Sequence, residues 1–207
     1  QLAQQLNQIN TARQQQETLI LEGVYQRFTP AMANRRTVVM ADPSWSAGLV
    51  GIVASRLQQE LFYGPTVVLS IDQQQGTARG SARSIAGFDI HDALERCSDL
   101  LLRWGGHRMA AGLTLAVGQL EPFAERLEAV AQEHEATIFV PKGRVDLELD
   151  LELVTSELFT AIQQLEPHGH GNPAPCFAAR NIPVTVMKAF GRDSKHLRMA
   201  IGSTHQG

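Results

Sequence analysis

The sequence predicts an α/β fold in which a sheet is flanked by helices. Between residues 36 and 134, short apolar segments alternate with amphipathic segments of helical spacing, which is the pattern of a sheet covered by helices. A long glutamine-rich segment with helical spacing precedes this region, and a segment of period two follows Pro141. We therefore expect a connector helix (residues 1–30), an α/β domain (31–138), and a linker with an incomplete β domain (139–207).

The expected elements of the first two regions follow in chain order. Leu2, Leu6 and Ile9 have helical spacing and no proline occurs before Thr29-Pro30, so one long helix should end there. Helices capped by the side chains of Ser46 and Asp89 should cover residues 46–57 and 90–102. A further helix is expected over residues 120–134, and strands over 36–41, 65–71, 76–81 and 111–117.

After Pro141, apolar residues alternate with acidic residues from Val145 to Leu153, which predicts one long amphipathic strand. A helix should cover residues 155–165 and a loop 167–175. Two strands, 177–190 and 196–201, should be joined around residues 191–194. Because a two-stranded hairpin is not stable alone, we expect this β domain to be incomplete.

Composition excludes some classes of protein. A formal charge of −3 and a pI near 6.2 exclude a strongly basic, histone-like protein, but local charge still permits a nucleic-acid site. Cys97 and Cys176 lie far apart without metal-type spacing, as is typical of a reduced, cytoplasmic protein. No apolar run of 18 residues and no secretory signal occur, so no membrane partner is expected.

Residues 104–112 carry the most informative local pattern, Trp-Gly-Gly-His-Arg-Met-Ala-Ala-Gly. Gly105 and Gly106 predict a sharp turn whose backbone N–H groups an anion can approach. His107 can donate to a phosphate or titrate near neutral pH. An ordinary Gly-Gly turn with an exposed histidine fits the same pattern.

A second basic pattern lies on the strand expected around Gly80. Arg79, Ser81 and Arg83 should point to one face of that strand, and guanidinium groups beside a hydroxyl suit a phosphate. No acidic residue occurs between Gly76 and Phe88, nor between residues 100 and 118. These two uncompensated basic segments predict an anion site, although a solvated strand face would look alike.

The C-terminal residues 180–207 contain five Lys or Arg against one acid. A basic hairpin with an aromatic side chain, here Phe190, is typical of single-strand binding by an OB-fold. The alternative is a basic surface patch. The candidate secondary nucleic-acid contacts are Lys188, Arg192, Lys195 and Arg198.

No metal site is predicted. The acidic residues between 146 and 152 are better explained as the wet face of a strand. His168 and His170 have no cysteine or carboxylate at matching spacing, so a flexible loop is the favoured interpretation.

Several stretches carry a resemblance to a known family. Gly-Gly-His-x-x-Ala-Ala-Gly at residues 105–112 resembles the signature of the DHH-associated domain, found in the DHH phosphoesterase superfamily and in alanyl-tRNA synthetases. A set of further stretches resembles the RecJ family of bacterial single-stranded-DNA-specific exonucleases: residues 6–13, 45–56, 80–85, 91–94, 105–107 and 165–177.

The resemblance implies a DHH-associated domain followed by the start of an OB-like domain. It also implies the nucleic-acid-binding portion of a 5′-to-3′ single-stranded-DNA exonuclease used in DNA repair and recombination. Substrate phosphates would be held by Ser81, Arg83, Gly105, Gly106 and His107, and His107 would support charge on the scissile group. Arg79 as a further phosphate contact follows from the strand pattern alone.

The chain departs from the family at two points. The family usually has Trp-His where this chain has Trp45-Ser46, and no Asp-His-His motif, which in the family holds Mn²⁺ or Mg²⁺, occurs here. We therefore expect the chain to begin after the metal-bearing DHH domain, with that domain and single-stranded DNA as its partners. Alone it should hold no cofactor and cut nothing.

Two other functions share part of the pattern. An RNA-binding accessory module, as in the alanyl-tRNA synthetase branch, would prefer folded tRNA to a plain DNA strand. A short-oligonucleotide phosphoesterase would bind dinucleotides tightly and gain nothing from longer strands.

Overall fold

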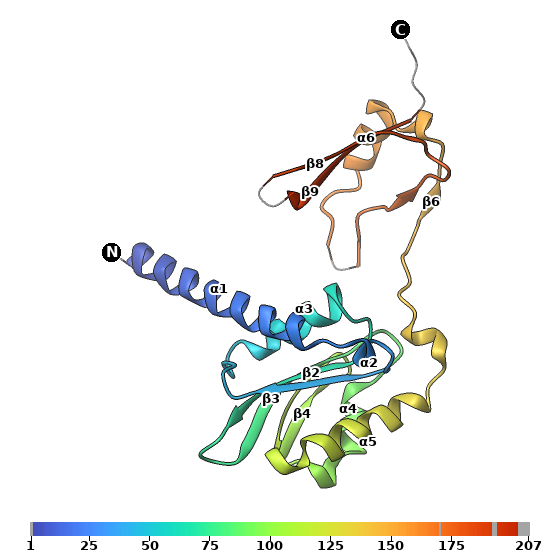
Figure 1. Ribbon diagram of the computed structural model, residues 1–207. Helices are drawn as coiled ribbons and strands as arrows, with labels where there is room; N and C mark the ends of the chain where they lie inside the picture. The colour runs from blue at the N-terminus through green and yellow to red at the C-terminus, as the bar shows by residue number, and fades with distance from the viewer. Residues whose placement is uncertain (1, 170, 192–193, 203–207) are drawn as a thin grey trace. The chain divides into compact units, whose positions relative to one another are not determined.

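The computed structural model describes residues 2–169, 171–191 and 194–202. The chain divides into two compact units, Gln1–Pro141 and Lys142–Gly207 (Figure 1), which are described separately below.

The first unit is built on one mixed sheet of five strands. In spatial order these are β1 (Val38–Asp42), β2 (Thr66–Asp72), β3 (Thr77–Arg83), β5 (Ala110–Ala116) and β4 (Arg103–His107). β1 and β2 are parallel, and the other neighbours are antiparallel. The α/β fold predicted from the alternation of segments is therefore confirmed.

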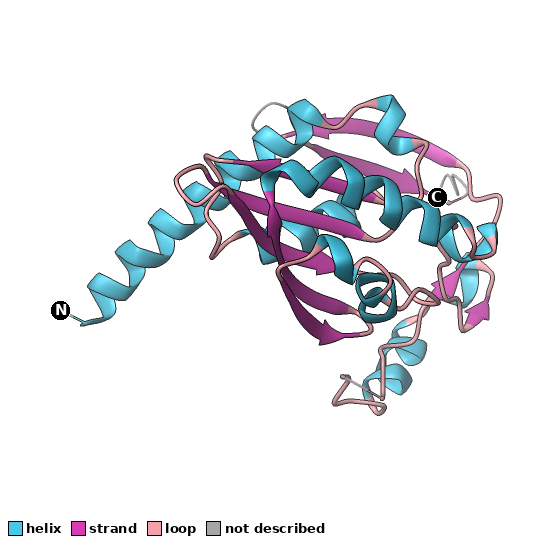
Figure 2. Ribbon diagram, turned by 90° about the horizontal axis from the view of Figure 1, so that it is seen from below, coloured by secondary structure: helices cyan, strands magenta, loops and turns pink. Residues whose placement is uncertain are grey.

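Helices lie on both faces of this sheet (Figure 2), and β2 is buried on both sides, whereas alternate residues of β3, β5 and β4 remain partly or fully exposed on one face. Val67 and Leu69 of β2 belong to the core that includes side chains of α4 (Ile90–Glu95) and α5 (Leu120–Gln132). Val68, which points the other way, belongs to the core shared with α1 (Leu2–Arg27) and α3 (Val50–Glu60). Burial on both faces explains why β2 is almost continuously apolar.

The long N-terminal helix is confirmed as α1. Its second half packs on the sheet through Ile20, Leu21 and Val24, whereas Leu2, Leu6 and Ile9 are exposed. The first half of α1 therefore projects beyond the sheet (Figure 1). Thr29 ends this region by capping the short helix α2 (Pro30–Ala33).

The predicted helix caps differ in outcome. The Asp89 carboxylate accepts from the N–H groups of His91 and Asp92 and caps α4, as predicted, but α4 ends at Glu95 and a 3-10 turn, Ser98–Leu100, follows. The Ser46 prediction is wrong, because α3 begins at Val50 without a side-chain cap. The Ser46 carbonyl oxygen, not its side chain, accepts hydrogen bonds from the backbone N–H groups of Leu49 and Val50.

The predicted Gly-Gly turn is also wrong. Gly105 and Gly106 lie inside β4, and the turn to β5 is formed by Arg108 and Met109. Trp104 packs against the apolar core on the α5 side of the sheet. As a result, β4 continues through both glycines in register with β5, and the chain reverses after His107.

The second unit has less regular structure. β6 (Leu147–Glu148) pairs in parallel with β7 (Phe177–Ala178), and β8 (Val184–Phe190) pairs antiparallel with β9 (His196–Ile201). The helix α6 (Ser156–Gln163) is capped by the Thr155 side chain.

Two strands predicted in this unit are shorter than expected. The expected strand over residues 145–153 is reduced to β6, because residues 151–153 turn into a 3-10 helix. The strand expected over residues 177–190 is interrupted. Asn181 there adopts a φ of 55°, and β7 pairs with β6 instead of continuing into β8.

Candidate nucleic-acid interface

The register of β3, β5 and β4 forms three rows of residues on one sheet face, which we call the three-row face. The rows are Arg79–Thr114–Arg103, Ser81–Gly112–Gly105 and Arg83–Ala110–His107. Residues directly opposite in antiparallel strands point to the same side. The structure thus brings together two segments, residues 79–83 and 103–114, that are separate in the sequence, as the anion-site prediction requires.

The opposite side chains of β5 identify which face this is. Ala111, Leu113 and Leu115 are buried in the core with α5, so Gly112 and its row neighbours face the side of α3. A cleft of about 890 Å³ opens there, lined by residues of β3, β5, β4 and the start of α3. The space over Gly105 is open, because an added Cβ would meet nothing within 4 Å.

Arg83 is held in a fixed orientation at one end of the three-row face. Its Nε donates to Ser55 Oγ at 2.8 Å, and its Nη1 donates to Ala82 O at 2.9 Å and to Ser81 Oγ. Burial lowers the pKa of this guanidinium. No carboxylate of the described residues forms an ion pair with it. A half-buried cation without a counter-charge favours an anionic ligand.

The start of α3 adds to the positive potential of the cleft. Gly48, Val50 and Gly51 line the cleft, and a Cβ on Gly51 would lie 3.2 Å from Arg83 Nη2. Glycine at this position lets the helix start approach the Arg83 guanidinium closely. The partial positive charge of a helix N-terminus favours anions.

The six residues predicted to bind substrate are not equivalent in the structure. Arg79, Ser81, Arg83, Gly105 and His107 share the three-row face. Gly106 pairs with Ala111, has a φ of 151°, and leaves no room for a Cβ, which would lie 2.5 Å from Ala110 O. Its role in the fold is therefore to let β4 pass close to β5.

The structure adds Arg103 and Thr114 to the candidate residues, because they complete the row of Arg79. A strand register for residues 103–116 would have found them, but the expected Gly-Gly turn concealed it. Arg108, in contrast, is compensated, since its Nε lies 3.3 Å from Asp89 Oδ2. The basic segment at residues 100–118 is thus only partly free of acidic partners.

The loop containing the Trp45-Ser46 departure lies beside the same cleft. Trp45 is buried and its carbonyl accepts from Ser70 Oγ at 2.6 Å. Ser46 is exposed and directly precedes Ala47 and Gly48, two residues of the cleft lining. A hydroxyl at position 46 therefore stands near the mouth of the cleft.

In the second unit, Lys188 and Arg198 are directly opposite each other on β8 and β9, and both are exposed. Like charges in such a pair destabilise a sheet, and an anion lying across them would relieve this. The Phe190 ring lies 5.6 Å from the His196 ring. Lys195 immediately precedes β9, and Arg192 lies outside the described residues.

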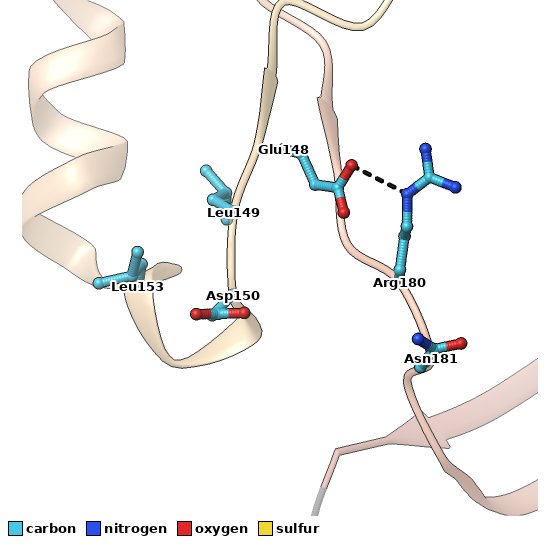
Figure 3. Close-up of a pocket in the computed structure, with 6 residues that line it drawn as sticks. All are labelled: Glu148, Leu149, Asp150, Leu153, Arg180 and Asn181. Carbon is cyan, nitrogen blue, oxygen red and sulfur yellow. Dashed lines mark hydrogen bonds and ion pairs between the residues drawn. The ribbon is translucent and has the colours of Figure 1, made fainter.

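A hollow of about 580 Å³ in the second unit has a different charge (Figure 3). Glu148 and Asp150 line it, and Arg180 Nε lies 2.9 Å from Glu148 Oε2. Because its one cation is paired and two carboxylates face it, this hollow does not suit a phosphate.

Among the described residues, neither a metal-ligand cluster nor a membrane-spanning helix occurs. No three His, Cys, Asp or Glu side chains lie together as a metal-ligand set in that part of the chain, so its residues do not fit the Mn²⁺ or Mg²⁺ that the family implies. In the same residues, no helix has the length and apolar character to cross a membrane.

Two family models match the chain in the order of its units. Residues 34–133 match the DHHA1 domain, and residues 145–206 match the RecJ OB domain. The single-stranded-DNA-specific exonuclease RecJ of Bacillus subtilis is 34% identical over 97% of this chain. The chain belongs to the RecJ family.

RecJ proteins of other bacteria are similarly close. The protein named RecJ from Thermus thermophilus is 34% identical over 88% of the chain. A crystal structure of Thermus thermophilus RecJ in complex with Mn²⁺ superposes with a TM-score of 0.80, at 28% identity over 97% of the chain. A complex with Mg²⁺ gives 0.77. The chain spans about a quarter of the length of these RecJ relatives, 26% for both sequences and 29% for the Mn²⁺ structure.

Proposed function

We propose that this chain is the substrate-binding portion of a RecJ exonuclease that degrades single-stranded DNA from the 5′ end in DNA repair and recombination. The supporting observation is the three-row face, where Arg79, Ser81, Arg83, Gly105 and His107 share one side of the sheet and Arg79, Ser81 and Gly105 line the cleft. The half-buried Arg83 there has no acidic partner in the described chain. Such a surface binds phosphates and leaves the bases of a single strand free.

We assign the metal-dependent cleavage to a DHH domain carrying Mn²⁺ or Mg²⁺, and the three-row face to the opposite wall of the substrate site. His107, exposed at the sheet edge, would donate to the phosphate nearest the reaction. The basic hairpin β8–β9 would contact DNA phosphates through Lys188 and Arg198, and the sequence offers Lys195 and Arg192 as further contacts. We assign this degradation of DNA to the bacterial cytoplasm.

The first test is binding of a labelled, 5′-phosphorylated single-stranded DNA of about 15 nucleotides, followed by fluorescence anisotropy at several salt concentrations. Arg83→Ala and His107→Ala should each weaken binding, and Arg83→Ala should make it less sensitive to salt. Arg126→Ala is the matched control, because Arg126 is an exposed residue of α5, which packs on the opposite face of the sheet, and pairs with Asp99. If neither Arg83→Ala nor His107→Ala weakens binding, the assignment of the three-row face to substrate binding is overturned.

The alternatives are distinguished in the same assay. Preference for a folded tRNA over the plain DNA strand would indicate an RNA-binding accessory module. Equal affinity for a dinucleotide and the longer strand would indicate a short-oligonucleotide phosphoesterase.

A further inference from the structure

The row Arg79–Thr114–Arg103 at one end of the three-row face has features of a separate anion site. Register places the two arginines on either side of Thr114. They are two strand spacings apart, roughly 10 Å between Cα atoms. Both arginines and Thr114 line the cleft of about 890 Å³. A hydroxyl flanked by two guanidinium groups offers donors from three directions to one phosphate.

Neither arginine is occupied elsewhere. In the described part of the chain, Arg79 and Arg103 make no ion pair and no side-chain hydrogen bond, and both are exposed. Asp72 is the one carboxylate among the described cleft residues. Its Oδ1 accepts from the N–H groups of Gln74 and Gln75, within the turn between β2 and β3. The two guanidinium groups are therefore available to a ligand.

This row lies apart from the Arg83 site. Arg79 and Arg83 are four residues apart on β3, which corresponds to roughly 13 Å along the strand. Arg83 is also held by Ser55, Ser81 and the Ala82 carbonyl, so its guanidinium does not swing toward Arg79. One phosphate held by Arg83 thus leaves the row of Arg79 free for another.

Small residues connect the two ends. Gly112 and Gly105 form the row between them, and a Cβ built on either glycine would meet no atom closer than 3.8 Å. A sugar-phosphate backbone could therefore lie close to the sheet between the two sites without displacing a side chain.

We propose that Arg79, Thr114 and Arg103 form a second phosphate subsite, which holds a neighbouring phosphate of the same strand while Arg83 and Ser81 hold the first. This inference rests on the proposed function and extends it. The ligand it requires is a nucleic acid strand with at least two phosphates in succession.

The test is competition of short ligands against the labelled 15-nucleotide strand. Thymidine 5′-monophosphate offers one phosphate, and the 5′-phosphorylated thymidine dinucleotide offers two. The unaltered chain should bind the dinucleotide at least about fivefold more tightly. Arg103→Ala should reduce this gain to less than about twofold and weaken monophosphate binding by a smaller factor than dinucleotide binding, whereas Arg103→Lys should keep part of the gain.

Two control variants distinguish failure of the second subsite from failure of the proposed function. Arg83→Ala should weaken both ligands by similar factors, and Arg126→Ala should change neither. If both ligands compete and the dinucleotide gain persists in Arg103→Ala, the second subsite is wrong and the proposed function stands. If neither ligand competes with the strand while Arg83→Ala still weakens strand binding, the second subsite is wrong and the proposed function stands. If neither Arg83→Ala nor His107→Ala weakens strand binding, both are overturned.

Discussion

At the scale of single residues, adjacent glycines have different duties. Gly105 faces the open cleft, whereas Gly106 has a φ of 151° and no space for a Cβ. Gly106 is thus required by the fold and Gly105 by the ligand, although the sequence shows only two adjacent glycines.

We expect Gly106→Ala to lower the free energy of unfolding by about 1–3 kcal/mol, because alanine is strained at this φ and its Cβ would press on the β5 backbone. Gly105→Ala should leave the free energy of unfolding nearly unchanged and weaken DNA binding by placing a methyl group in the cleft. Urea unfolding and anisotropy measure the two effects. Equal stability of both variants would contradict the assigned roles.

Prediction at this scale succeeded where alternation along one strand was sufficient. Arg79, Ser81 and Arg83 share a face because successive side chains of a strand alternate, and the sequence shows that directly. Arg103 and Thr114 were missed because their place depends on the β4–β5 register. That register is fixed by the burial of Leu113 and the packing of Trp104 on the same core, a tertiary effect that overrides the turn propensity of glycine.

At the scale of elements, Glu128 of α5 joins the helix to the start of β1. Its carboxylate accepts from the backbone N–H of Arg36 and from the N–H and hydroxyl of Thr37, at 2.7–3.1 Å. Burial alone would raise the pKa of Glu128, but these donors outweigh it and hold the pKa below its ordinary value. Arg36 in turn donates to the Ala131, Gln132 and His134 carbonyls at the end of α5.

We expect Glu128→Gln to lower the free energy of unfolding at neutral pH by about 1–3 kcal/mol, since an ionised acceptor is lost from buried donors. The folded-state pKa is lowered, so this stabilisation is present above the unfolded pKa, near 4.5. It disappears as the pH falls through the folded value. Chemical unfolding at pH values from 7 down to 3 should show the difference from the unaltered chain shrinking below about 4.5.

Glu125→Gln is the matched control, because Glu125 is exposed and pairs with Arg35 on the surface. It should change the free energy of unfolding by less than about 1 kcal/mol. A pH-independent difference for Glu128→Gln would show that the carboxylate charge has no part in holding α5.

At the scale of the whole molecule, the two units differ in how well the sequence predicts them. The first unit buries β2 on both faces and β3 and β5 on one face, so its apolar pattern predicts four of the five strands of the sheet. In the second unit every residue of β8 and β9 is exposed, and the alternation at residues 145–153 has no partner strand along most of its length. A period-two pattern without a sheet to pair with does not produce a strand.

The basic hairpin should act only on long ligands. We expect Lys188→Ala combined with Arg198→Ala to weaken binding of the 15-nucleotide strand and lower its salt dependence, because two exposed cations that are proposed to contact phosphates are removed. Binding of the phosphorylated dinucleotide should not change. Anisotropy measures binding of the strand, and competition measures binding of the dinucleotide. An equal loss of affinity for both ligands would contradict a hairpin contact that acts only on long ligands.

The most direct test of the central claim is to locate bound DNA by ¹H–¹⁵N NMR of the chain during titration with 5′-phosphorylated oligothymidylate. We predict that the backbone amide signals of Ser81, Gly105 and Gly112 shift together and saturate at one strand concentration. Shifts confined to the hollow beside Glu148 and Arg180, with the three-row face unaffected, would contradict it.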